Sequence, residues 1–75
     1  MISEDAVPAF VFAYNGFYTN IFADTECWSY EVIVDDQVIL WDEELSRERM
    51  SIGVLIELLL AKIDDLNAIN YRNLN

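Results

Sequence analysis

The stretch Ser51–Ile69, SIGVLIELLLAKIDDLNAI, decides the fold of this chain. Its large apolar residues recur at steps of three and four positions, which places them in one stripe along an α-helix. Ser51 can cap the first turn through its hydroxyl, with Ser46 as the competing start. Gly53 in the first turn costs about 1 kcal/mol relative to alanine, a cost that close approach of a strand would explain. The spacing predicts a helix over residues 51–69, with a stripe of Ile52, Leu55, Ile56, Leu59, Leu60, Ile63, Leu66 and Ile69.

Upstream of the helix, the chain is rich in the β-branched and aromatic residues that favour strands. Asn15-Gly16 is a strong turn signal, because both residues tolerate the positive φ angles of a two-residue type I′ turn. It predicts strands over residues 7–14 and 17–23, the first at a sheet edge because Pro8 has no N–H to donate. The bulkier face, expected to line the core, carries Phe10, Phe12, Tyr14, Phe17, Thr19 and Ile21. The opposite face carries Ala9, Val11, Ala13, Tyr18, Asn20 and Phe22.

A second hairpin is predicted from strands over residues 27–34 and 38–42, joined by Asp35-Asp36 with or without Gln37. A two-residue loop would pair Val34 with Gln37, and a three-residue loop would pair it with Val38. The choice reverses the faces of the fourth strand. In both registers Tyr30, Val32 and Val34 share a face and Glu31 and Ile33 lie on the other, which gains either Ile39 and Trp41 or Val38 and Leu40.

These elements predict a single α+β domain over residues 1–75. It would be a small antiparallel sheet of three to four strands, made of two hairpins, with one C-terminal helix packed on one face. Both faces of the second hairpin are apolar, whereas one helix can cover only one of them. We expect the other face to be buried in a contact with a second subunit, and therefore a homodimer.

The composition narrows the functional classes. A chain of 75 residues buries only about 60% of its unfolded surface, and Cys27, the single cysteine, cannot form an internal disulfide. We therefore expect a reducing, cytoplasmic setting, and no signal peptide or membrane span. The chain has no histidine, and its carboxylates lack the spacing of a calcium loop, so we expect no metal, cofactor or catalytic activity. Cys27 follows Glu26, which should raise the pKa of its thiol and leave it unreactive.

The charge is strongly negative. Fourteen acidic residues face four basic ones, a net charge of −10, yet the chain also holds ten aromatic residues. Aromatic content of this kind indicates a folded domain with an acidic surface rather than a disordered tail. Such a surface repels phosphate and disfavours direct nucleic-acid binding, whereas a basic protein is its natural partner.

The candidate site residues are the acidic turns and one tryptophan. Any single carboxylate pair is explained by solubility, but so large an excess of charge on a small body costs stability and so suggests a use. We expect Trp28 and Tyr30 to lie in the core and Trp41 to be exposed beside carboxylates. The predicted partner-binding residues are Asp35, Asp36, Trp41, Asp42, Glu43, Glu44, Asp64 and Asp65.

This plan of a very small, acidic, aromatic-rich sheet with one helix resembles that of phage-encoded inhibitors that imitate DNA. Inhibitors of uracil-DNA glycosylase, of restriction enzymes and of CRISPR complexes are examples. The resemblance rests on size, charge and element order, and no motif residue carries over. The leading expectation is a non-catalytic acidic inhibitor whose carboxylates form an array spaced like the phosphates of a nucleic-acid backbone, and which occludes a basic site of a DNA- or RNA-handling protein. The alternative is a structural or assembly subunit that binds a partner through the second apolar face of the sheet, with its acidity serving only solubility.

Overall fold

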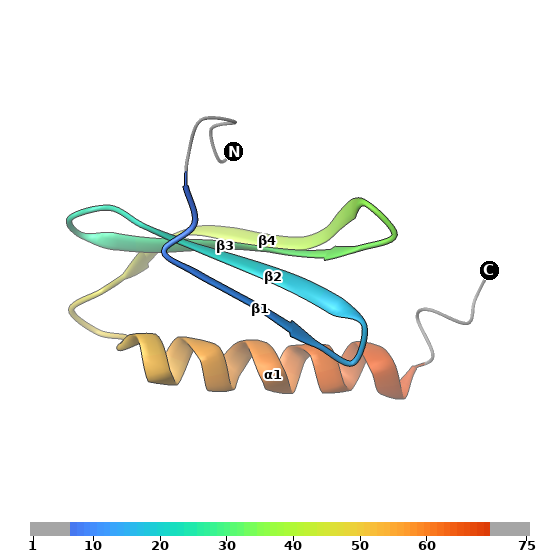
Figure 1. The fold of residues 1–75 in the computed structure, drawn as a ribbon. Helices are drawn as coiled ribbons and strands as arrows, with labels where there is room; N and C mark the ends of the chain where they lie inside the picture. The colour runs from blue at the N-terminus through green and yellow to red at the C-terminus, as the bar shows by residue number, and fades with distance from the viewer. Residues whose placement is uncertain (1–6, 70–75) are drawn as a thin grey trace.

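The computed structural model describes residues 7–69, and residues 1–6 and 70–75 lie outside this range. Four antiparallel strands form one sheet in the order β1-β2-β3-β4, and a helix runs along one face of it (Figure 1). The elements are β1 (Phe10–Tyr14), β2 (Phe17–Ala23), β3 (Cys27–Val34), β4 (Gln37–Ser46) and α1 (Ile52–Ala68). The predicted α+β fold of two hairpins and a C-terminal helix is confirmed.

The turns at residues 15–16 and 35–36 lie at the end of the sheet where α1 finishes, and the β2–β3 turn lies where α1 begins (Figure 1). Asn15 and Gly16 have φ angles of 52° and 82°, and Asp35 and Asp36 have φ angles of 51° and 63°. Positive φ at both central residues is the mark of a type I′ turn, whose twist matches that of the flanking strands. The first hairpin therefore pairs Tyr14 with Phe17, as predicted.

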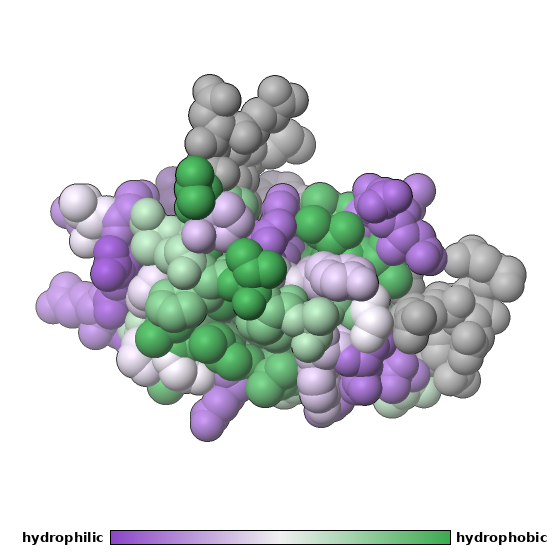
Figure 2. Space-filling view, in the orientation of Figure 1, coloured by the Kyte–Doolittle hydropathy of each residue, from purple (hydrophilic) through white to green (hydrophobic). Residues whose placement is uncertain are grey.

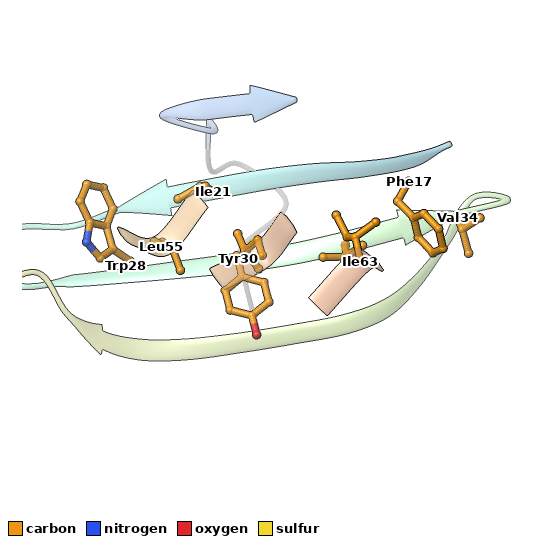
Figure 3. Packing of buried hydrophobic residues seen from close by; sticks show 9 residues of the cluster. Phe17, Ile21, Trp28, Tyr30, Val34, Leu55 and Ile63 are labelled. Atoms are coloured by element: carbon orange, nitrogen blue, oxygen red, sulfur yellow. The ribbon is translucent and has the colours of Figure 1, made fainter. Parts of the chain in front are cut away.

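The core lies between the sheet and α1 (Figure 3). Leu55, Leu59 and Ile63, spaced one helical turn apart, are fully buried, which confirms the central line of the predicted stripe. Trp28 lies near Leu55 at one end of the core, and Phe17 and Val34 lie near Ile63 at the other. The buried apolar side chains are Phe17, Ile21, Trp28, Tyr30, Val32, Val34, Leu55, Leu59 and Ile63.

Element ends differ from the prediction in three places. The first strand begins at Phe10 rather than residue 7, and because it is an edge strand, Phe10 stays 43% exposed. The helix covers Ile52–Ala68 rather than residues 51–69, because Ser51 and Ile69 are its caps. The Ser51 hydroxyl accepts from the Val54 N–H at 3.3 Å. Ile69 is 62% exposed, so the end of the predicted stripe lies outside the core.

The third difference is that β4 continues to Ser46, so Asp42, Glu43 and Glu44 lie inside a strand that they were expected to terminate. Two irregularities in the β3–β4 pairing make this possible. The turn pairs Val34 with Gln37 and Ile33 with Val38, the register of a two-residue loop; beyond Ile39 the pairing becomes Val32–Leu40 and Glu31–Trp41, the register of a three-residue loop. Because each extra residue reverses the faces, Leu40 turns to the helix and both Val38 and Trp41 turn away from it.

Glu44 sits at the second irregularity with a φ of 63°, a conformation that costs a residue with a side chain about 1 kcal/mol or more. Replacing Glu44 with glycine should therefore raise the free energy of unfolding by about 1 kcal/mol. Glu43→Gly is the matched control, since Glu43 does not have positive φ and glycine there should destabilise the strand. Urea denaturation of the two variants measures the difference, and equal effects would contradict the strain.

Gly53 is not needed for a close strand. Among residues 7–69, a methyl group added at this position would meet only the Ser51 hydroxyl, at 4.0 Å, so that expectation is wrong. Gly53→Ala should raise the free energy of unfolding by up to about 1 kcal/mol through helix propensity alone. The reverse change at the exposed Ala61 within α1, Ala61→Gly, should lower it by a similar amount. Thermal unfolding of both variants tests this, and a loss of stability in Gly53→Ala would refute it.

Candidate functional site

The face of the sheet turned away from α1 carries apolar side chains that no segment among residues 7–69 covers. Four of them are well exposed: Val11 at 63%, Tyr18 at 59%, Val38 at 49% and Trp41 at 57%. Strand pairing places them in two rows across the sheet, Ala13–Tyr18–Ile33–Val38 and Val11–Asn20–Glu31–Trp41. We call these two rows the open face.

A polar pair lies in the middle of the second row. Asn20 and Glu31 are directly opposite on β2 and β3, and the Asn20 side-chain amide donates to Glu31 Oε2 at 2.9 Å. Both side chains are half-buried. The bond fixes the carboxylate of Glu31 between Asn20 on one side and Trp41, its partner on β4, on the other. The open face is therefore apolar at its borders and holds one oriented carboxylate near its centre.

Trp41 is the predicted site residue that the structure places on the open face. Its exposure follows from the bulge at Ile39, because without that extra residue Trp41 would point toward α1. Sheet position also separates it from Trp28, which is buried, donates its indole N–H to the Met50 carbonyl at 2.8 Å and lies under the Arg47 guanidinium. The two tryptophans thus divide as predicted, one in the core and one exposed.

The predicted carboxylates are distributed over the molecule. Asp35 and Asp36 occupy the β3–β4 turn, Asp42 pairs with the buried Tyr30 on the helix side of β4, and Glu44 lies toward the β2–β3 end. Burial, followed by the charge of Asp42, raises the pKa of Tyr30. Asp42 also accepts from the Glu43 N–H at 2.8 Å.

Asp64 and Asp65 lie on different sides of the C-terminal end of α1. Asp64 accepts from the Tyr14 hydroxyl at 2.9 Å and from the Asn15 side-chain amide at 3.4 Å, so it ties the first turn to the helix. The same hydrogen bond and the charge of Asp64 raise the pKa of Tyr14. Asp65 lies with Leu40 and Leu66 around a shallow hollow beside β4. The structure therefore gives Asp64 a structural contact and does not join the two residues into one site.

The spacing along β4 shows how the acidic groups are arranged. Five residues, Gln37 to Trp41, separate the Asp35-Asp36 turn from Asp42, a distance of roughly 15–20 Å of strand. A nucleic-acid strand carries one phosphate about every 3.4 Å of helix axis. The carboxylates of the β3–β4 turn and of β4 therefore form two groups rather than one continuous row, and the apolar side chains of Val38 and Trp41 lie between them.

The β2–β3 end of the molecule is ordered by Asp24. Its carboxylate accepts from the backbone N–H groups of Glu26, at 2.8 Å, and Cys27, at 2.6 Å, and these bonds lower its pKa. Burial raises the pKa of the Cys27 thiol, and the nearby carboxylates of Asp24, Glu26 and Glu44 raise it further. This confirms the predicted direction for Cys27, which stays protonated and weakly nucleophilic at neutral pH.

A second apolar area lies along the β1 edge. In Figure 2 apolar side chains gather over β1 and the adjoining side of α1, and hydrophilic ones lie toward the two ends of the molecule. Phe10 on β1 contributes to the exposed apolar surface, as does Val7 just before it, at 85%. Val11, the residue after Phe10 on this edge strand, lies on the open face.

Among residues 7–69 no three potential ligands gather in a group that could hold a metal ion. α1, the helix of this part of the chain, lacks the length and apolar character to cross a bilayer. Comparison with protein-family models, with curated proteins and with solved structures finds no significant match.

Two features of the open face were not predicted from the sequence as parts of a site: the exposed Tyr18 and the hydrogen bond between Asn20 and Glu31. Tyr18 was assigned correctly to the face away from the core but not to a site, and the Asn20–Glu31 bond joins residues eleven positions apart. The sequence signal for both is the type I′ turn, which fixes the alternation of β2. The register of β2 against β3 depends instead on the longer turn at residues 24–26. The pairing of Asn20 with Glu31 therefore could not be predicted from the sequence.

Proposed function

We propose that this protein is a small non-catalytic binding protein that docks, through the open face of its sheet, on a basic protein. The observation that carries the proposal is an exposed tryptophan and three further exposed apolar side chains on a sheet face that residues 7–69 leave uncovered. Large exposed apolar areas rimmed by polar residues are typical of protein-binding surfaces. The net charge of −10 favours a partner whose binding surface is positively charged.

The open face has the anatomy of a protein interface. Interfaces carry an apolar centre enriched in aromatic residues and a polar rim, and tryptophan and tyrosine supply much of the binding energy. Trp41, Tyr18 and Val38 would form the apolar contact. The Asp35-Asp36 turn and the Asp42–Glu44 segment flank it along β4 and would steer a basic partner during association.

The second candidate is a nucleic-acid-mimicking inhibitor of a DNA- or RNA-handling protein, of the kind that phages use against host defence. The excess of ten negative charges favours it. Its carriers would be the carboxylates of residues 35–36, 42–44 and 64–65, with Trp41 as an apolar anchor. The two candidates share a basic partner and differ in which groups provide affinity: the apolar contact in the first and the charges in the second.

The third candidate is self-association through the open face, which would give the homodimer that the sequence predicts. A second copy would bury the apolar rows, but it would also bring together two acidic surfaces and two copies of Glu31. Charge complementarity therefore favours a basic partner over a second copy. Sedimentation equilibrium of the wild type and of Trp41→Ala tests this form, since a dimer built on the open face should dissociate in the variant.

Affinity measurements on a panel of purified DNA- and RNA-binding proteins test the proposal. Trp41→Ala should weaken binding by about 30-fold or more, the effect of losing a hot-spot residue, at both low and high salt. Asp42→Asn combined with Glu43→Gln and Glu44→Gln should mainly slow association and flatten the salt dependence. Leu58→Ala, on the exposed side of α1, serves as the control. If the triple variant abolishes binding and Trp41→Ala does not, the mimicry candidate replaces the open-face proposal.

A further inference from the structure

We infer that Glu31, held by Asn20 and flanked by Trp41, is a docking point for an arginine side chain of the partner. This inference rests on the proposed use of the open face and names the chemistry of the partner group. Glu31 is one acidic residue within an apolar surface, away from the acidic turns. Three facts carry the inference: its fixed orientation, its surroundings and the position of the chain's own cations.

The orientation comes from strand pairing. Glu31 is directly opposite Asn20 on β2 and Trp41 on β4, and such pairs have their Cβ atoms about 4.5–5.5 Å apart. Asn20 donates to Oε2 at 2.9 Å, which holds the carboxylate in the row and leaves further acceptor positions on both oxygens. The negative group is thus placed before any partner arrives, so little side-chain freedom remains to be lost on binding.

The surroundings make a cation the required complement. A partner that covers the open face removes water from Glu31, and a buried carboxylate with one amide donor is strongly unfavourable unless a charged donor joins it. The chain's own described cations are elsewhere. Arg47 lies over the buried Trp28, Arg49 lies in the segment between β4 and α1, and Lys62 lies on α1. None of the cations among residues 7–69 is placed beside Glu31, and we assign the positive group to the partner.

The neighbouring ring favours arginine over lysine. A guanidinium is planar, stacks on an aromatic face and donates two parallel bonds to one carboxylate, whereas an ammonium is a strongly hydrated point charge. Trp41, 57% exposed and next to Glu31, supplies the ring. Tyr18 and Phe22 lie on the same face at neighbouring positions of β2 and would border the alkyl part of the side chain.

The test is a titration of the full chain with N-acetyl-argininamide, in which two-dimensional NMR measures the chemical-shift changes of the protein. We expect millimolar binding, with the largest shifts at the Trp41 indole N–H and the Asn20 side-chain amide. N-acetyl-citrullinamide, which keeps the shape and lacks the charge, should bind at least tenfold more weakly, and N-acetyl-lysinamide should bind several-fold more weakly. Glu31→Gln should weaken argininamide binding at least tenfold, and Glu57→Gln, the same charge change on the exposed side of α1, should leave it within twofold.

Three results would overturn the inference: shifts centred on residues 35–36 or 42–44, equal binding of citrullinamide, or no effect of Glu31→Gln. Trp41→Leu, which keeps an apolar side chain, provides a second variant and should also weaken argininamide binding several-fold. The proposed function fails separately, because it depends on the affinity of Trp41→Ala for a whole protein partner. If that affinity falls while argininamide binds elsewhere, the open face remains the docking surface and only the arginine anchor is refuted.

Discussion

Truncating Leu59 to alanine is expected to lower the free energy of unfolding by about 2–5 kcal/mol. Leu59 is fully buried at the centre of the helix stripe, between Leu55 and Ile63, so the lost methyl groups leave a cavity under the sheet. A domain of 75 residues has a total stability of roughly 4–11 kcal/mol. The variant should therefore be largely destabilised, and unfolded in part at 37 °C if the wild type lies near the lower value.

Leu58→Ala is the matched control for this prediction. It is the same chemical change one position earlier in α1, but Leu58 is 38% exposed and outside the buried core. Its cost should stay below about 1 kcal/mol. Urea denaturation followed by tryptophan fluorescence measures both variants. Similar losses in the two would mean that α1 does not pack on the sheet through the Leu55–Leu59–Ile63 line.

Replacing Thr19 with valine is expected to raise the free energy of unfolding by about 1–3 kcal/mol. Thr19 is fully buried on the helix side of β2, and within the described part of the chain its hydroxyl oxygen has no hydrogen-bond partner. The hydroxyl therefore loses its hydration on folding, and no hydrogen bond compensates for that loss. Valine has nearly the same shape, so the change removes the polar group without altering the packing against Phe12 and Val32, its strand neighbours.

Thr19→Ser separates the hydroxyl from the methyl group. Serine keeps the unpaired oxygen and removes the methyl, so this variant should be less stable than the wild type by about 1 kcal/mol. The opposite signs of the two substitutions identify the hydroxyl as the source of the cost. A loss of stability in Thr19→Val, measured by the same urea denaturation, would show that the hydroxyl is satisfied in solution.

Local chemistry made much of the fold predictable. The Asn15-Gly16 turn fixed the first hairpin because few residues accept two positive φ angles in succession. The helix was predictable because apolar residues spaced three and four positions apart lie on one face of an α-helix. The Asp35-Asp36 turn was recognised but its register was left open, and the structure combines the two registers by inserting Ile39 as an extra residue.

The candidate site was less predictable than the fold. The exposure of Trp41 was expected, yet its face was decided by the bulge, which depends on how β4 continues past residue 42. The sequence analysis predicted that the carboxylates act together in one binding site. The structure places them at both ends of the sheet and on two sides of α1. Asp64 proved to hold the Tyr14 hydroxyl, a contact across fifty positions that no local pattern specifies.

The sequence by itself determined the element types, the first turn, the core side of each of the first three strands and the acidic character of the surface. These follow from periodicity, from turn chemistry and from counting charges, which are local or additive properties. Tertiary structure decided the register of β4, the face of Trp41 and the pairing of Asn20 with Glu31. Those features depend on how strands distant in the chain align under α1, where one added residue reverses every side chain that follows.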